Sequence, residues 1–482
     1  MSSRSVLKRP TPYSGSKKSV PVDDSIFETL STMHPDAAGI DIGSETHYVS
    51  VPPDRDEQPV RTFGCFTPDI EAMAKWLKKC GIRHIVMEST GVYWMPSYQI
   101  LTAAGFDVKL VDARHTKNVP GRKTDVWDAK WLRKLHTFGL LQGCFLPPVE
   151  MNEMRAYWRH RANLVDSAAQ QLQRMQKSME MMNVQLHKVV SHIDGVTGMA
   201  IMRAIVAGER DPDNLVRYLQ RGLKHSPETF KKALTGNYQP EHVFALRQAI
   251  ASYDFIANQI DECESQLKVC MAKITDRGPI ICSKSAPVAI TADTTSDGSR
   301  PRTRKKEPNF ELHAELIRIA GVDLAKIDSI STLTFQTVIS ELGPDLQSRF
   351  PTEDHFSSWL GVVPNNQITG GKVRSRRTRR VANRVTNALR MAAQSLHHSK
   401  SALGAFYRRL RSKLGAPKAI VATAHKLARL IWRMLTYGQD YVDIGQERYE
   451  KLTAERQLKA LKRAAEALGC TILNKDTGEV YA

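Results

Sequence analysis

Short apolar runs alternate with polar turns over residues 36–112 and predict a sheet flanked by helices. The runs AAGIDIG, THYVSV and VRTFGCF have the length and residue types of strands. The next segment, PDIEAMAKWLKKCG, predicts a helix that Thr67 caps, with Pro68 in the first turn and Gly81 at the end. A strand in IRHIVME, a helix in YWMPSYQILTAAG, a strand in DVKLVDA and a helix starting near Thr124 follow.

The predicted order of elements is therefore β-β-β-α-β-α-β-α. Three strands before the first helix favour a mixed sheet over a strictly alternating parallel one. This order is typical of an RNase H-like domain, so we expect an α/β fold of that kind over residues 36–148.

The rest of the chain has the pattern of helices. The long runs MRAYWRHRANLVDSAAQQLQRMQKSMEMMNVQLHKVV and HVFALRQAIASYDFIANQIDECESQLKVCMAKI predict an antiparallel coiled-coil pair within 149–275, whose apolar stripe forms a core or a dimer seam. Residues 276–309 are rich in Ser, Thr and Pro and then basic, which predicts a linker. A mainly helical domain is expected over 310–450, a peripheral charged helix with a short tail over 451–482, and a mobile tail over 1–35.

The charge balance of the chain favours a polyanionic partner. Its 482 residues include 69 Lys and Arg against 50 Asp and Glu, a net charge of +19, which indicates nucleic acid rather than a neutral metabolite. The 7 cysteines form no C-x-x-C pair, so neither a zinc knuckle nor a disulfide scaffold is indicated. Without an apolar run of membrane-spanning length or a hydrophobic leader, we expect a cytoplasmic protein with no membrane partner.

Four carboxylates stand out in the first 130 residues. Asp41 lies among apolar neighbours in GIDIG, where a buried charge is costly unless it is paired or bound to metal. Glu88 ends the strand IRHIVME, at the edge where α/β sites usually open. Asp125 and Asp128 are spaced i and i+3, which places both on one helix face. If these residues converge, they suit Mg²⁺ or Mn²⁺, hard cations that can promote phosphoryl displacement.

Each carboxylate also has a structural alternative when it is taken alone. Asp41 fits a turn, Glu88 fits a helix cap, and the D-x-x-D pair fits a solvated helix face. The loop that precedes the D-x-x-D pair is basic, as an approaching DNA phosphate would require, although an ordinary exposed loop has the same composition. Its basic residues are Arg114, His115, Lys117, Arg122 and Lys123.

The chain resembles the DEDD transposases of bacterial insertion sequences, in the one-ten family of bridge-RNA-guided recombinases. The resemblance runs from AAGIDIG through MESTGVYW and NVPGRKTDVWDA to FSSWLGVVPNNQITGGKVRSRR and SKSALGAFYRRLRSKLGAPKAIVATAHKLARLIWRML. It implies a RuvC-like domain, a coiled-coil domain and a C-terminal transposase domain. It also implies that Asp41, Glu88, Asp125 and Asp128 form the metal-binding tetrad.

The sequence departs from the family at one position. The family has a nucleophilic Ser before a Gly pair, whereas this chain has Thr369 before Gly370 and Gly371. Threonine carries the same hydroxyl, but its β-branch restricts χ1 and crowds the oxygen, which predicts a slow or abolished in-line attack. The alternative role for this hydroxyl is to satisfy the backbone of a Gly-rich turn.

The segment after Thr369 has an extreme charge balance. No acidic residue occurs between Asp354 and Asp440. Because solvated charged faces usually mix both signs, this segment predicts a surface that binds phosphates. Its basic residues near Thr369 are Lys372, Arg374, Arg376, Arg377, Arg379, Arg380, Arg384 and Arg390.

The resemblance implies an enzyme that cleaves and rejoins DNA at donor and target sites through a covalent protein–DNA intermediate. It further implies a guide (bridge) RNA that pairs with both DNAs, and a dimer or tetramer that acts on the bacterial nucleoid. Two alternatives remain: a metal-dependent nuclease that resembles a Holliday-junction resolvase, and a nucleic-acid-binding protein without activity.

Overall fold

The computed structural model describes residues 30–89, 91–112, 124–147, 149–278, 307–438, 441–473 and 480–481. The chain divides into two compact units, residues 1–146 and 147–482. The expected linker lies largely outside the described residues, as does most of the expected N-terminal tail. Each unit is described by itself below.

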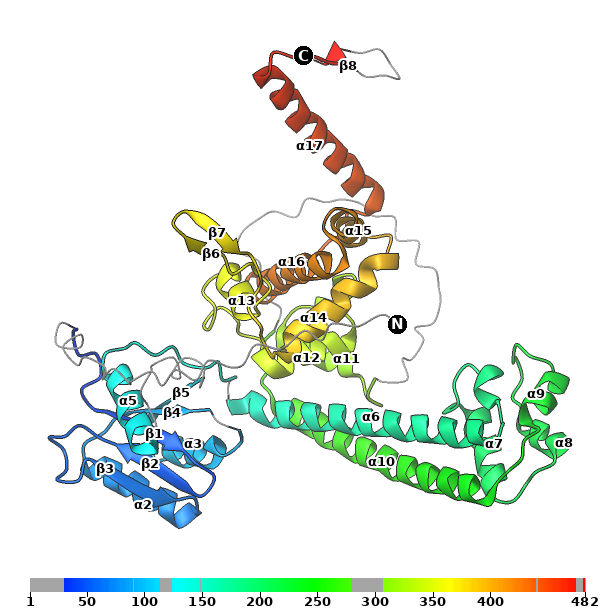
Figure 1. The fold of residues 1–482 in the computed structure, drawn as a ribbon, viewed down its shortest axis with the longest axis horizontal. Helices are drawn as coiled ribbons and strands as arrows, with labels where there is room; N and C mark the ends of the chain where they lie inside the picture. The colour runs from blue at the N-terminus through cyan, green and yellow to red at the C-terminus, as the bar shows by residue number, and fades with distance from the viewer. Residues whose placement is uncertain are drawn as a thin grey trace, which may run out of the picture. The chain divides into compact units, whose positions relative to one another are not determined.

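The first unit contains a five-stranded mixed sheet in the order β3-β2-β1-β4-β5 (Figure 1). β1 pairs antiparallel with β2, and β2 with β3, whereas β1, β4 and β5 run parallel. The mixed sheet predicted from three leading strands is thus confirmed. The elements are β1 (Ala37–Ile42), β2 (Thr46–Ser50), β3 (Val60–Gly64), α2 (Thr67–Lys79), β4 (His84–Glu88), α3 (Trp94–Ala103), β5 (Asp107–Val111) and α5 (Asp125–Thr137).

Successive side chains of β1 point to opposite faces of the sheet. Ala38, Ile40 and Ile42 point into the larger core, which α2 and α3 cover. Gly39 faces α5 instead, and a Cβ on Gly39 would lie 2.3 Å from the carbonyl oxygen of Ala129 in that helix. Glycine is therefore needed because the helix backbone approaches the strand too closely for any side chain.

The start of α2 differs from the sequence prediction. Phe66 holds the capping position with extended backbone and makes no side-chain cap, while Thr67 is already the first helical residue. The amides of Asp69 and Ile70 donate to the carbonyl of Phe66, so the hydrogen-bond pattern begins one residue earlier than expected. The prediction that Thr67 caps the helix was wrong. Pro68 lies in the first turn as predicted, and Gly81 follows the helix with a φ of +70°.

The second unit is largely helical, as expected, and its longest elements are α6 (Val149–Met181) and α10 (Pro240–Lys273). These helices lie side by side (Figure 1). They are antiparallel, because Arg161 bonds Glu264 at 2.8 Å and Glu153 lies 3.7 Å from Lys273. Both Arg161 and Glu264 are buried, so this ion pair fixes the register at the end of the pair that joins the C-terminal helices.

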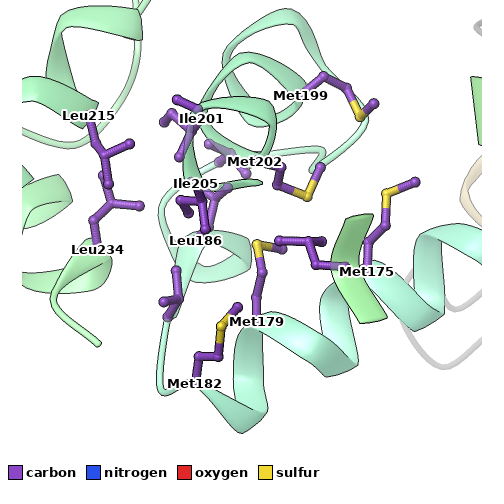
Figure 2. Close-up of a cluster of buried hydrophobic side chains, with 14 of the residues drawn as sticks. Met175, Met179, Met182, Leu186, Met199, Ile201, Met202, Ile205, Leu215 and Leu234 are labelled. Carbon is purple, nitrogen blue, oxygen red and sulfur yellow. The ribbon is translucent and has the colours of Figure 1, made fainter. Parts of the chain in front are cut away.

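Methionines dominate the core at the other end of the helix pair. Met175 and Met179 from the end of α6, and Met182 directly after it, lie in one buried cluster with Met199 and Met202 (Figure 2). Flexible thioethers fill the irregular space between the long pair and the short helices. Those short elements are η1 (Leu186–Lys188), α7 (Val196–Val206), α8 (Pro212–Leu215), η2 (Val216–Tyr218) and α9 (Pro227–Leu234).

The C-terminal part of the second unit has helices around a hairpin that the sequence analysis did not predict. Helix α12 joins this part to α6, because Trp158 donates to Thr337 at 3.2 Å and Arg159 to Glu341 at 2.7 Å. The elements are α11 (Leu312–Ala320), η3 (Leu324–Lys326), α12 (Thr332–Leu342), α13 (Glu353–Trp359), β6 (Gln367–Thr369), β7 (Lys372–Ser375), α14 (Arg384–Ser395), η4 (Leu396–His398), α15 (Ala402–Leu414), α16 (Ala416–Tyr437), α17 (Gln446–Ala467), β8 (Ile472–Leu473) and β9 (Val480–Tyr481).

The contact between Gly39 and α5 yields a first prediction. Gly39→Ala should destabilise the first unit by about 1–3 kcal/mol, because the new methyl meets fixed helix backbone rather than a movable side chain. Amide hydrogen exchange of β1, β4 and α5 measures the effect. Gly143→Ala is the control, since its nearest neighbour is the flexible Lys109 side chain at 3.2 Å and the nearest backbone atom, the oxygen of Leu110, lies at an ordinary contact distance of 3.7 Å. Equal protection in both variants would contradict the assigned packing.

Candidate functional site

Two carboxylates lie at the C-terminal ends of neighbouring parallel strands. The register of β1 and β4 pairs Gly39 with Val86 and Ile40 with Met87. One further step places Glu88 beside Asp41. Because side chains alternate along a strand, both acids project from the face on which Gly39 and Val86 meet α5.

Helix α5 carries the other two acids to the same end of this face. Its last residue, Thr137, accepts bonds from the amides of Met33 and His34, which precede β1, so the helix runs antiparallel to the strand. Asp125 and Asp128 lie in the first turn of α5. Ala129 is one of the residues of α5 that lie against Gly39, and Asp125 lies about 6 Å from it along the helix axis. Asp41 lies about 7 Å beyond Gly39 along the strand, so the two acids reach a similar height.

The four acids differ in exposure. Glu88 is 8% exposed, Asp41 and Asp128 are half-buried, and Asp125 is exposed. Their oxygen donors fit a hard divalent cation. In the described ranges, no three His, Cys, Asp or Glu side chains are arranged so that they could hold a metal ion. A complete coordination sphere would therefore need side-chain rotation or donors beyond these ranges.

Sequence reasoning missed a fifth carboxylate at this edge. Asp112 follows β5 directly, and its predecessor Val111 pairs with Glu88 in the neighbouring strand. The signal was present in DVKLVDA, where an acid ends an apolar strand just as in IRHIVME. The basic residues Arg114, His115, Lys117, Arg122 and Lys123, expected near this edge, lie outside the described residues.

Thr369 lies at the tip of the hairpin formed by β6 and β7. Thr369 pairs with Lys372 across a two-residue turn, Gly370 and Gly371, whose φ angles are +57° and +73°. Two positive φ angles are those of a type I′ turn, which explains the glycine pair without any contribution from the threonine hydroxyl. All residues of β6 are exposed, so the Thr369 side chain is open to solvent.

The basic segment after Thr369 lies mostly on the surface. Lys372 and Arg374 are two residues apart in β7, so their side chains lie on the same face of the hairpin. Arg379 donates to the carbonyl of Ser358, and Arg384 lies 4.0 Å from Glu341, so these two help to hold the fold. Arg390 is half-buried. The remaining exposed residues of the segment are Arg376, Arg377 and Arg380.

The apolar content of the helices bears on membrane association. Among the described residues, every helix is too short or too polar to cross a bilayer.

Comparison with known proteins gives the class of the chain. Residues 38–183 match a family model of DEDD type described as "Transposase", and residues 322–408 match one described as "Transposase IS116/IS110/IS902 family". A protein from Sinorhizobium fredii named "Putative transposase y4pF/y4sB" is 32% identical over 102 residues, which cover 19% of this chain and 25% of that relative. The two family models and this relative together support a transposase of the IS116/IS110/IS902 family.

The exposed arginines in and just after the hairpin yield a second prediction. Changing Arg374, Arg376, Arg377 and Arg380 together to Gln should weaken nucleic-acid binding and flatten its log–log salt dependence by about one unit per lost phosphate contact. Fluorescence anisotropy at several salt concentrations measures the slope. The control changes four exposed basic residues elsewhere in the second unit: Arg221, Lys224, Lys232 and Lys268. Equal slopes for both variants would show that the segment makes no special phosphate contacts.

Proposed function

We propose that this protein cleaves and rejoins DNA strands at donor and target sites, with Asp41, Glu88, Asp125 and Asp128 holding a divalent metal. The observation that carries the proposal is the meeting of three elements at one end of one sheet face. Two acids come from adjacent parallel strands, and two from the first turn of the helix that covers them. Carboxylate oxygens that meet at one edge are the donors that a hard divalent cation prefers.

We further propose that the first unit is RNase H-like. Its support is the strand order β3-β2-β1-β4-β5, with three antiparallel strands followed by two parallel ones. In this arrangement the central strand β1 supplies one acid and its parallel neighbour supplies the second. The metal would be Mg²⁺ or Mn²⁺. When bound, it would activate the attacking oxygen and stabilise the leaving oxygen at phosphorus.

The hydroxyl of Thr369 is the proposed nucleophile. Its Oγ attacks a backbone phosphorus of DNA, a threonine–phosphate bond forms, and the P–O bond to one deoxyribose breaks and leaves a hydroxyl. A hydroxyl of the second DNA then attacks the same phosphorus, rejoins the strand and returns the proton to threonine. The exposed hairpin tip supports this role, because the Thr369 side chain there is open to solvent.

The partners proposed are donor DNA, target DNA and a guide RNA, with the protein acting as a dimer or tetramer. The support is the resemblance of the chain together with an exposed basic surface, whose Arg and Lys side chains suit backbone phosphates. The metal site of one subunit would act with the Thr369 hairpin of another. The proposed place of action is the bacterial nucleoid.

The alternative is a hydrolytic nuclease that resembles a Holliday-junction resolvase. The crowded oxygen of a β-branched residue favours it, because water would then replace Thr369 as the nucleophile. The two functions share the metal site and differ in whether protein becomes bound to DNA.

The carboxylates yield a third prediction. Asp41→Asn and Glu88→Gln should each lower strand cleavage by at least about 100-fold, which corresponds to about 3 kcal/mol of transition-state stabilisation. Single-turnover cleavage of labelled DNA in Mg²⁺ measures this loss, and circular dichroism checks the fold. Asp107→Asn is the matched control, because Asp107 begins β5 at the opposite end of the same sheet. Cleavage by Asp41→Asn at the rate of the control would exclude the tetrad.

Thr369 yields a fourth prediction. Thr369→Ala should retain DNA and RNA binding yet form no covalent adduct, while Thr369→Ser should form at least as much adduct as the natural chain because the methyl group is gone. A denaturing gel of protein with labelled DNA, guide RNA and Mg²⁺ detects the adduct. Ser375→Ala, at the end of the same hairpin, is the control. Adduct in Thr369→Ala would move the nucleophile elsewhere, and cleavage without adduct in all variants would favour the hydrolytic alternative.

A further inference from the structure

A cavity of about 410 Å³ lies in the second unit, and the residues that line it follow the Thr369 hairpin in the sequence. Its walls come from the end of α14, from η4, from α15 and from the start of α16. The polar residues that line it are Gln394, Ser395, His397, His398 and Arg411. Its volume falls within the range of protein pockets that take small ligands.

The side chains that line this cavity are positive or neutral. Arg411 contacts both ring nitrogens of His397 through one guanidinium nitrogen, at 3.0 Å and 2.8 Å. A guanidinium only donates hydrogen bonds, so His397 must accept through an unprotonated nitrogen. Burial and the charges of Arg411, His398 and Arg408 all lower the pKa of His397, in agreement with a neutral ring.

The cavity has the electrostatics of an anion site. The contact with His397 leaves the charge of Arg411 uncompensated, because the neutral ring offers one acceptor nitrogen and carries no negative charge. Arg408 lies outside the cavity wall and directs its guanidinium to the carbonyls of His397 and Ser399 and to Gln446, and its charge makes the potential at His397 more positive. No acid occurs in the sequence from 355 to 439, which includes every residue that lines the cavity.

The start of α16 adds a further positive contribution. Ala416, its first residue, lines the cavity, and the capping residue Gly415 has no side chain that could satisfy the amides of the first turn. Pro417 has no amide hydrogen, so these amides are those of Ala416 and Lys418. Helix α16 has 22 residues, and its aligned peptide dipoles place a partial positive charge at its N-terminus. Backbone amides at a helix N-terminus, next to an arginine, form a suitable site for a phosphate oxygen.

We propose that this cavity binds a phosphate group of a nucleic-acid strand, held by Arg411 and the first turn of α16. The inference rests on the proposed function for the identity of the anion, but not on the metal site or the nucleophile. A concave site of this kind would hold one nucleotide at a defined place, in contrast to the flat basic surface after Thr369. It would therefore orient the bound strand.

The test compares two arginines of the same helix. Arg411 lines the cavity, whereas Arg409 lies on another face of α15, over the rings of Phe406 and Tyr449. Arg411→Gln should weaken binding of a single-stranded oligonucleotide about tenfold, as expected for a lost charge-assisted bond. Arg409→Gln should change it less than twofold. Anisotropy is measured in EDTA with the Asp41→Asn chain, so that cleavage does not enter.

A footprint on the histidines locates the ligand. Diethylpyrocarbonate modifies neutral imidazoles, and the oligonucleotide should protect His397 and His398 in the natural chain and in Arg409→Gln but not in Arg411→Gln. Equal loss of affinity in both arginine variants would reduce the cavity to part of a diffuse surface and overturn the proposal. Protection by inorganic phosphate but not by the oligonucleotide would overturn the nucleic-acid assignment. Neither result depends on cleavage, so the proposed function is tested separately.

Discussion

The close approach of helix α5 to Gly39 in β1 determines where the four acids lie. A strand with any side chain at this position would push the helix away, since the site of a Cβ is only 2.3 Å from the oxygen of Ala129. The contact fixes both the height and the direction of α5. Its first turn, with Asp125 and Asp128, therefore lies over the strand ends that carry Asp41 and Glu88. The candidate site is thus a consequence of packing as much as of its acidic residues.

Charge is distributed in the second unit so that a segment without acids can still fold. Glu353, just before this segment, binds Arg433 at 2.5 Å and also bonds Arg429, and these arginines lower its pKa to about 2. Glu341 likewise binds Arg159 from α6. Glu353 therefore neutralises Arg429 and Arg433 of α16 within the segment, and Glu341 lies 4.0 Å from Arg384 of α14. The positive charge that remains faces solvent at the hairpin and in the cavity, where nucleic acid can use it.

Periodicity was sufficient to predict the first unit because its elements are short and regular. The apolar pattern of AAGIDI identifies Asp41 as a charged residue within an apolar strand. The i, i+3 spacing of Asp125 and Asp128 predicts that both lie on one helix face. The register between strands could not be predicted from the sequence. That Asp41 and Glu88 lie side by side was therefore only an expectation until the strand order was known. The role of Thr67 was wrong because Phe66 already adopts the capping conformation.

Features built from several distant elements escaped prediction. QITGGKV contains a Gly pair between β-prone residues, which is a recognisable hairpin signal, but its strands are too short for periodicity to detect. The cavity beside Arg411 has no sequence signal, because its walls come from α14, η4, α15 and α16 and only their packing defines it. Asp112 was missed although it ends a strand as Glu88 does.

The account depends most on a metal ion at the carboxylate edge, and iron-directed cleavage of the chain tests this directly. Fe²⁺ in place of Mg²⁺, with ascorbate and peroxide, generates hydroxyl radicals that cut nearby backbone, and mass spectrometry maps the cuts. The account predicts cuts around Asp41, Glu88 and Asp125–Asp128 that excess Mg²⁺ suppresses and that Asp41→Asn removes. Cuts confined to other parts of the chain, or cuts at this edge that persist in Asp41→Asn, would contradict it.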